Sequence, residues 1–109
     1  MCISKIKIRP EKDIQLAILH YLKSIGCVCG KTKTMGVRYG KVFRYDIWTM
    51  RGKCDLEAFK NGVMYGIEVK SGYNKLTPEQ EMYRDLFHKP PDRVFILARK
   101  LEDVINIIR

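Results

Sequence analysis

The chain of 109 residues is predicted to be a single α/β domain, in which helices flank a mixed β-sheet. Apolar residues recur at helical spacing near the start of the chain and twice in its last third. Asn61-Gly62 separates two runs of alternating apolar residues, which indicates a hairpin. Val94 to Ala98 is a short, continuously apolar run, typical of the centre of a sheet. The predicted order is helix, strands, helix, strand, helix.

The first helix is predicted from about Pro10 to Ile25. Proline suits the first helical position, and Gly26 provides the C-terminal stop. The preceding segment, 1–9, alternates weakly and is expected to be an arm or a short edge strand. The stripe of the helix that should face the core comprises Ile14, Ile18, Tyr21, Leu22 and Ile25.

Strands are predicted at Cys27–Lys33 and Val42–Met50, with a loop or arm at Gly36–Gly40 between them. The net charge is +9, from 21 Lys and Arg against 12 Asp and Glu, and the excess concentrates in this region. Basic residues interleaved with aromatic ones suit the backbone of a nucleic acid. A solvated strand pair would show the same composition. The candidate DNA-contacting residues are Lys31, Lys33, Arg38, Lys41, Arg44, Arg51 and Lys53.

The hairpin places two carboxylates side by side. With Asn61-Gly62 as a type I′ turn, Leu56 is expected to pair with Ile67, and Asp55 with Glu68. Directly opposed residues point to the same face, with Cβ atoms roughly 4.5–5.5 Å apart. The opposite face should be buried, and it comprises Cys54, Leu56, Ala58, Val63, Tyr65, Ile67 and Val69.

Lys70 lies two residues beyond Glu68 and therefore shares the face of the carboxylate pair. Like charges opposite each other destabilise a sheet, so a divalent cation is the natural candidate to offset the cost. An alternative is a cross-strand pair of Asp55 and Glu68 bridged by Lys70, which would contribute only about 0–1 kcal/mol if it were exposed.

A second helix is predicted to open at Thr77 with a sequence resembling a capping box, and to end at 88–91. After the apolar strand, Leu101 to Ile108 is predicted as a closing helix. The residues of the second helix expected to face inward are Met82, Tyr83, Leu86 and Phe87.

Two further polar side chains are expected to point toward the hairpin. Glu11 shares a side of the first helix with Ile14 and Ile18, and Gln80 shares one with the inward residues of the second helix. Each also has a purely structural interpretation. Glu11 would complement the helix dipole, and Gln80 would be the glutamine of the capping box.

The four cysteines do not form a disulfide framework, and buried reduced thiols are the preferred interpretation. A zinc site built from Cys27, Cys29, His20 and Cys54 is the alternative. No apolar run reaches the roughly 18 residues of a membrane span, and the N-terminus lacks the pattern of a signal peptide. We therefore expect a cytoplasmic protein.

The ordered set of motifs resembles the VRR-NUC family of the PD-(D/E)xK nuclease superfamily. The resemblance runs from Glu11 to about Ala98, and Cys54 departs from it by replacing the proline usual before the aspartate. It implies an αβββαβ restriction-endonuclease-like core, with residues 1–109 as one nuclease domain of the minimal stand-alone type found in phages and bacteria. The motifs that carry it are Glu11 with Gln15, Arg51-Gly52-Lys53-Cys54-Asp55-Leu56, Ile67-Glu68-Val69-Lys70-Ser71 and Leu76-Thr77-Pro78-Glu79-Gln80.

By this resemblance, Asp55, Glu68 and the Val69 carbonyl are the expected ligands of a metal ion, with Glu11 acting through water or on a second ion. Lys70 is expected to position the attacking water and help to deprotonate it, and Gln80 to orient Lys70 or the water. Hydrolysis of a phosphodiester needs an activated water and a counter-charge, both of which a hard cation held by oxygen atoms supplies. The oxygen-only set favours Mg²⁺ or Mn²⁺ over zinc.

The resemblance further implies a homodimer that cuts branched DNA, as a Holliday-junction resolvase does. If phage-encoded, the protein would act in the host cytoplasm. Rival interpretations are a nuclease that cuts linear duplex or flap DNA, and a non-catalytic DNA-binding module whose carboxylates and lysine form an inert ion pair.

Overall fold

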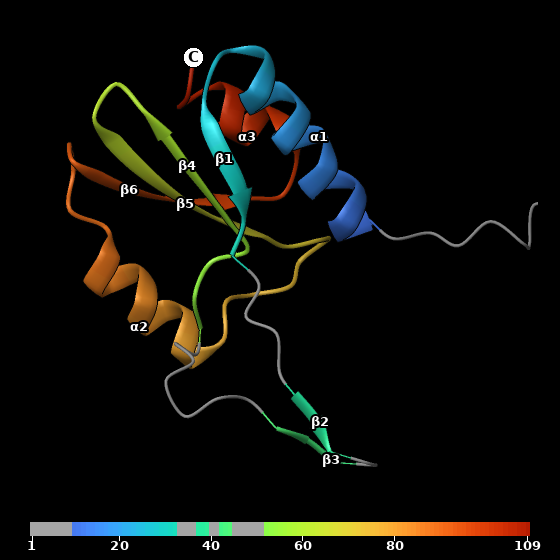
Figure 1. The fold of residues 1–109 in the computed structure, drawn as a ribbon. Helices are drawn as coiled ribbons and strands as arrows, with labels where there is room; N and C mark the ends of the chain where they lie inside the picture. The colour runs from blue at the N-terminus through green and yellow to red at the C-terminus, as the bar shows by residue number, and fades with distance from the viewer. Residues whose placement is uncertain (1–9, 33–36, 40–41, 45–51) are drawn as a thin grey trace, which may run out of the picture.

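A mixed four-stranded sheet forms the centre of the fold (Figure 1). The computed structural model describes residues 10–32, 37–39, 42–44 and 52–109. The strand order is β1-β4-β5-β6, with β1 antiparallel to β4, β4 antiparallel to β5, and β5 parallel to β6. The predicted α/β class with a mixed sheet is confirmed. The strands are β1 (Val28–Lys31), β4 (Leu56–Lys60), β5 (Val63–Val69) and β6 (Arg93–Ala98).

Two helices, α1 (Pro10–Ser24) and α3 (Leu101–Ile105), cover one face of the sheet (Figure 1). The Tyr21 hydroxyl ties them together by donating a hydrogen bond of 2.6 Å to the Ile108 carbonyl. The predicted inward stripe of the first helix is correct, with Ile18 and Leu22 buried and the rest packed against the core. The predicted closing helix is shorter than expected, although Ile108 is still buried. The core of this face comprises Ile18, Leu22, Cys27, Leu56, Ala58, Ile67, Val69, Ile96, Ala98, Val104 and Ile108.

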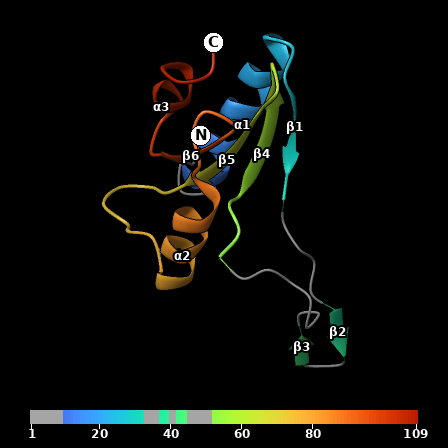
Figure 2. The ribbon, with the colours of Figure 1, turned by 90° about the vertical axis from the view of Figure 1, so that its left-hand side faces the viewer.

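The third helix, α2 (Pro78–Phe87), packs on the opposite face of the sheet, after a connection that projects outward from the end of β5 (Figure 2). Its Tyr83 ring stacks on Phe87, with centroids 5.4 Å apart, and meets Phe95 of β6 edge-on. Gly66 of β5 allows this approach, because a Cβ atom there would lie 3.1 Å from the Phe87 ring.

Two residues of α2 were expected to face inward and do not. Met82 and Leu86 are 65% and 68% exposed. The helix touches the sheet through Tyr83 and Phe87, one turn apart, and this narrow contact leaves the residues preceding each of them in solvent. The prediction treated all four apolar residues as one broad stripe, which was wrong.

The hairpin has the predicted register over β4 and β5, whereas the predicted pairing of Asp55 with Glu68 falls outside it, because Asp55 precedes β4. Lys60 pairs with Val63, and Leu56 pairs with Ile67. Asn61 and Gly62 both have positive φ angles, as a type I′ turn requires. Cys54 is buried as expected but faces α2 rather than the core, since its thiol lies 3.7 Å from the Tyr83 hydroxyl. Alternation failed there because β4 begins only at Leu56.

A separate two-stranded antiparallel sheet joins β2 (Val37–Tyr39) to β3 (Val42–Arg44). Within Gly36–Gly40, predicted as a loop or arm, Val37–Tyr39 form a strand. The strand predicted at Val42–Met50 is confirmed as far as Arg44, and its remainder, like segment 1–9, lies outside the described residues. None of the helices that the structure describes has the length and apolar character to cross a membrane.

Candidate active site

The candidate site lies at the end of the sheet where β5 and β6 finish together, because the two strands are parallel. The Lys70 amide, directly after β5, donates to the Ala98 carbonyl at the end of β6 over 3.0 Å. The start of α1 reaches the same end of β5 (Figure 1). Asp55, directly before β4, lies at this end too, since β4 runs antiparallel to β5. Polar residues distant in sequence therefore meet at one end of the sheet.

Glu68 is the most buried charged residue of the described chain, with 3% of its surface exposed. Its Oε1 accepts a hydrogen bond from Gln80 Nε2 at 2.8 Å, and Lys70 Nζ lies 3.8 Å from the same oxygen. Its Oε2 is buried and has no hydrogen-bond partner among the described residues. Burial, and then the charge of Asp55, raise the pKa of Glu68 to about 7, while Lys70 opposes the shift.

Asp55 lies just before β4 and turns its carboxylate toward β5. Its Oδ2 accepts a hydrogen bond of 2.9 Å from the Val69 amide, the residue that follows Glu68. Burial raises the pKa of Asp55, and the Val69 N–H group, which favours the charged form, opposes this. Asp55 thus makes Glu68 more costly to ionise, whereas contact with Glu68 lowers the pKa of Asp55.

Gln80 serves two purposes at once. It is the third residue of α2, and its Oε1 accepts from the Thr77 amide at 2.9 Å while the Thr77 hydroxyl accepts from the Gln80 amide. Its Nε2 donates to Glu68. Gln80 is therefore the glutamine of the capping box and also points toward the hairpin, as both interpretations predicted. The cap fixes which end of the amide faces the carboxylate.

Glu11 lies at the margin of this cluster rather than inside it. Its Oε1 is 3.2 Å from the Ser71 amide and 3.4 Å from the Ser71 hydroxyl. Its charge contributes to the raised pKa values of both Asp55 and Glu68, although it is the lesser cause in each. The described residues contain no group of three or more His, Cys, Asp and Glu side chains placed to hold a metal ion. Direct ligation would therefore fall to the Asp55 and Glu68 pair.

The residues present nevertheless suit a hard divalent cation. A buried carboxylate oxygen without a partner, beside a second carboxylate, is costly unless a positive charge or a proton neutralises it. The donors are all oxygen atoms, the type that Mg²⁺ and Mn²⁺ prefer. Asp55 and Glu68, with the Val69 carbonyl between Glu68 and Lys70 in the chain, would hold the ion.

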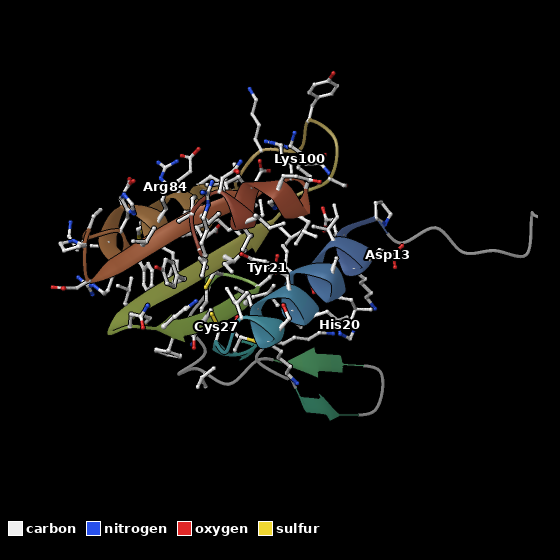
Figure 3. The ribbon with its side chains drawn as sticks, turned by 90° about the horizontal axis from the view of Figure 1, so that it is seen from above. Asp13, His20, Tyr21, Cys27, Arg84 and Lys100 are labelled. Carbon is white, nitrogen blue, oxygen red and sulfur yellow. The ribbon has the colours of Figure 1, made fainter. Side chains whose placement is uncertain are left out.

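The zinc alternative is not supported by the placement of its residues. Cys27 belongs to the core beneath α1, whereas Cys54 lies on the α2 side of the sheet. His20 is exposed on the outer side of α1, apart from Cys27 (Figure 3). The thiols of Cys27, Cys29 and Cys54 are free, and burial raises the pKa values of Cys27 and Cys54.

Several residues that support the site were not singled out from the sequence. The Thr32 amide donates to the Asp55 carbonyl at 3.0 Å, and the Thr32 hydroxyl donates to the Cys54 carbonyl. Gly52, at φ +77°, lies so close to α2 that a Cβ atom would be 2.4 Å from the Glu79 carbonyl oxygen. Gly52 belonged to the quoted motif, so a signal existed for it, whereas nothing in the sequence marked Thr32.

The predicted DNA-contacting residues that the structure describes lie on several elements. Lys31 is exposed on the edge strand β1, and Lys53 pairs with Glu57 at 3.0 Å. Arg38 belongs to β2 and Arg44 to β3. The remaining three, Lys33, Lys41 and Arg51, lie outside the described residues.

The order of elements and the mixed sheet define a restriction-endonuclease-like α/β fold. A solved structure described as a VRR_NUC domain superposes on this chain with a TM-score of 0.64, covering 93% of this chain and 96% of the other at 21% sequence identity. This chain therefore has the VRR-NUC fold. No protein-family model matches the sequence, and no curated protein matches it.

Proposed function

We propose that residues 1–109 act as one metal-dependent deoxyribonuclease domain that hydrolyses phosphodiester bonds. The observation that carries the proposal is the Glu68 carboxylate. It is buried beside Asp55 with one oxygen unpartnered among the described residues, an arrangement that costs stability in the absence of a cation. A site that destabilises its own fold in this way is typical of catalytic centres. The VRR-NUC fold is consistent with this activity.

A bound Mg²⁺ or Mn²⁺ would supply a Lewis acid for the scissile phosphate and lower the pKa of a bound water. Asp55 and Glu68 would hold the ion, and Gln80 would keep Glu68 in its orientation through the 2.8 Å hydrogen bond. Lys70, whose ammonium lies 3.8 Å from Glu68, would orient the attacking water and stabilise the charge that develops on the phosphate. Glu11 would act through water from its position beside Ser71.

The substrate that we propose is branched DNA, cut by a homodimer in the manner of a Holliday-junction resolvase. A four-way junction offers two equivalent scissile phosphates, which suits an enzyme with two-fold symmetry. The chain is small and strongly basic, which favours recognition of the phosphate backbone over the reading of bases. In the infected or producing cell the proposed location is the cytoplasm.

The test incubates the purified chain with a labelled four-way junction and with matched linear duplex, in Mg²⁺, Mn²⁺ or EDTA. Lys70→Ala is the inactive variant. Lys23→Ala, which removes an exposed lysine at the far end of α1, controls for the loss of one positive charge. The proposal predicts paired nicks on the junction that vanish with EDTA and with Lys70→Ala, and that persist with Lys23→Ala.

Other outcomes would select a rival function. Equal cutting of linear duplex or of flap DNA would keep the nuclease and remove the junction preference. DNA binding that is indifferent to Mg²⁺ and to Asp55→Ala, without any cutting, would leave a non-catalytic DNA-binding module.

A further inference from the structure

The loop between β5 and α2, residues 70–77, presents an unusually exposed aromatic side chain next to the candidate active site. Tyr73 is 98% exposed, which is far beyond the exposure of the other large hydrophobic residues described. It follows Lys70 by three positions, and Figure 2 shows its loop projecting from the body of the domain. A single exposed tyrosine needs no explanation by itself. The hydrogen bonds that hold the loop indicate whether this one has a function.

The loop is anchored on both sides of Tyr73. The Arg99 guanidinium donates a hydrogen bond of 2.7 Å to the Gly72 carbonyl, directly before the tyrosine. The Asn74 amide, directly after it, donates to the Ser71 carbonyl at 3.2 Å, and the Asn74 side chain reaches the Ser71 hydroxyl. The hydrogen bonds of the residues on either side of Tyr73 thus fix the backbone of the loop. The backbone at Tyr73 is thus held in place, while the aromatic ring does not pack on the protein.

The same anchor reaches the proposed catalytic residues. Ser71, which accepts from Asn74, donates its own amide to Glu11. Lys70, one residue earlier, lies against Glu68. The loop that carries Tyr73 is therefore connected, through Ser71 and Lys70, to the place where the phosphodiester would be cut.

Two exposed lysines accompany the loop. Lys75 follows Tyr73 by two residues and is exposed, and the exposed Lys100 adjoins the Arg99 anchor (Figure 3). Exposed ammonium groups flanking an exposed aromatic ring are the combination with which proteins hold a single-stranded nucleic acid. The backbone is neutralised, and a base stacks on the ring.

We infer that Tyr73 is a stacking platform for an unpaired base next to the scissile phosphate, and that it contributes the preference for branched over fully paired DNA. This inference rests on the proposed function, since it assigns a contact of the same substrate. A base inside a continuous duplex is not available to stack on a side chain, whereas a base at a branch point or in a single strand is.

The experiment uses a DNA branch with the fluorescent base 2-aminopurine at the branch point, and a matched fully paired duplex, both in EDTA so that binding is read without cleavage. Tyr73→Ala should weaken binding to the branch by about 5-fold to 150-fold and leave binding to the duplex within about 2-fold. The change in 2-aminopurine fluorescence on binding should disappear. Tyr73→Phe should behave as the unchanged protein, because stacking needs the ring and not the hydroxyl.

The control is Leu86→Ala, which removes a comparably exposed apolar side chain from the far end of α2 and should change neither affinity. The inference is overturned if the Tyr73→Ala variant binds and cuts the branch as the unchanged protein does. It is also overturned if the variant binds both DNAs more weakly by the same factor, or if the substitution shifts the oligomeric state instead. Failure of the unchanged protein to cut any DNA in Mg²⁺ or Mn²⁺, with branch binding that still depends on Tyr73, would sink the proposed nuclease and support the stacking platform. If the unchanged protein binds no DNA, both fail.

Discussion

Gln80 Nε2 donates a hydrogen bond of 2.8 Å to Glu68 Oε1, while the Oε1 of the same glutamine caps the first turn of α2. The start of a helix and the orientation of a buried carboxylate therefore depend on one amide group. This dual use links the stability of α2 to the chemistry of the site. The role of Gln80 as helix cap and its role as donor to Glu68 lead to separate predictions.

The two roles of Gln80 can be separated by substitution. Gln80→Glu keeps an acceptor for the Thr77 amide, so α2 should retain its cap, but it replaces the donor to Glu68 with a third carboxylate. At pH 8 in EDTA it should cost about 1–3 kcal/mol of stability, the usual penalty for leaving a buried charge without its partner. Gln80→Ala should also lose the cap.

Chemical unfolding, with helix content followed by circular dichroism, measures both Gln80 effects. The destabilisation by Gln80→Glu should shrink at about pH 5, where the added carboxylate repulsion is relieved by protonation. If Gln80→Glu lowered the free energy of unfolding by the same amount at both pH values, carboxylate repulsion would not be the cause of the destabilisation.

The metal-free protein should lose stability as the pH rises from about 5 to about 8. Glu68 in the folded chain has a pKa of about 7, above its ordinary value of 4.5, so the folded state binds the proton more tightly. Its contribution to folding is fully present below about pH 4.5 and is lost as the pH rises through 7, by about 1–3 kcal/mol. Urea unfolding in EDTA measures this profile.

Glu68→Gln is the matched control for the pH profile. It removes the titrating carboxyl and keeps an oxygen to accept from Gln80, so its stability should be flatter over the same pH window. At pH 8 it should be more stable than the unchanged protein and inactive, a trade that functional sites often show. A steep profile in this variant would assign the pH dependence to another group.

Addition of Mg²⁺ or Mn²⁺ should stabilise the protein and release protons near pH 6–7, because the cation competes with the proton on Glu68. A concentration 100 times the dissociation constant would add about 2.7 kcal/mol. The melting temperature and the heat of binding in buffers of different ionisation enthalpy give the two readouts. Asp55→Asn should abolish both effects, and an unchanged response in that variant would place the ion elsewhere.

Gly52→Ala should damage both folding and activity. The position has φ +77°, and a Cβ atom would lie 2.4 Å from the Glu79 carbonyl oxygen, so the first turn of α2 must shift and carry Gln80 with it. Gly62→Ala is the matched control, since φ is +79° there but nothing lies within 4 Å.

The conformational strain alone should cost about 1 kcal/mol at Gly62, whereas Gly52→Ala should cost at least about 2 kcal/mol. Thermal unfolding and the rate of DNA cleavage give the comparison. Equal losses of stability and of cleavage rate in the two variants would show that the close approach of Gly52 to α2 has no consequence.

Local patterns in the sequence determined the helices, the hairpin and the face that Glu68 shares with Lys70. The reason is that turn chemistry and period-two alternation act between neighbours, so Asn61-Gly62 sets the register of β4 and β5 without help from the rest of the chain. The same reasoning failed at Cys54, which precedes the strand, and at Met82 and Leu86, where the width of the contact between α2 and the sheet decided their exposure.

The tertiary structure alone decided how the site is assembled. Parallel pairing of β5 with β6 brings Arg99 to Gly72, and packing of α2 brings Gln80 to Glu68. It also decided that Glu11 turns to Ser71. Contacts between residues so far apart along the chain depend on how whole elements pack, and the burial that raises the pKa of Glu68 arises only when those elements exclude water together.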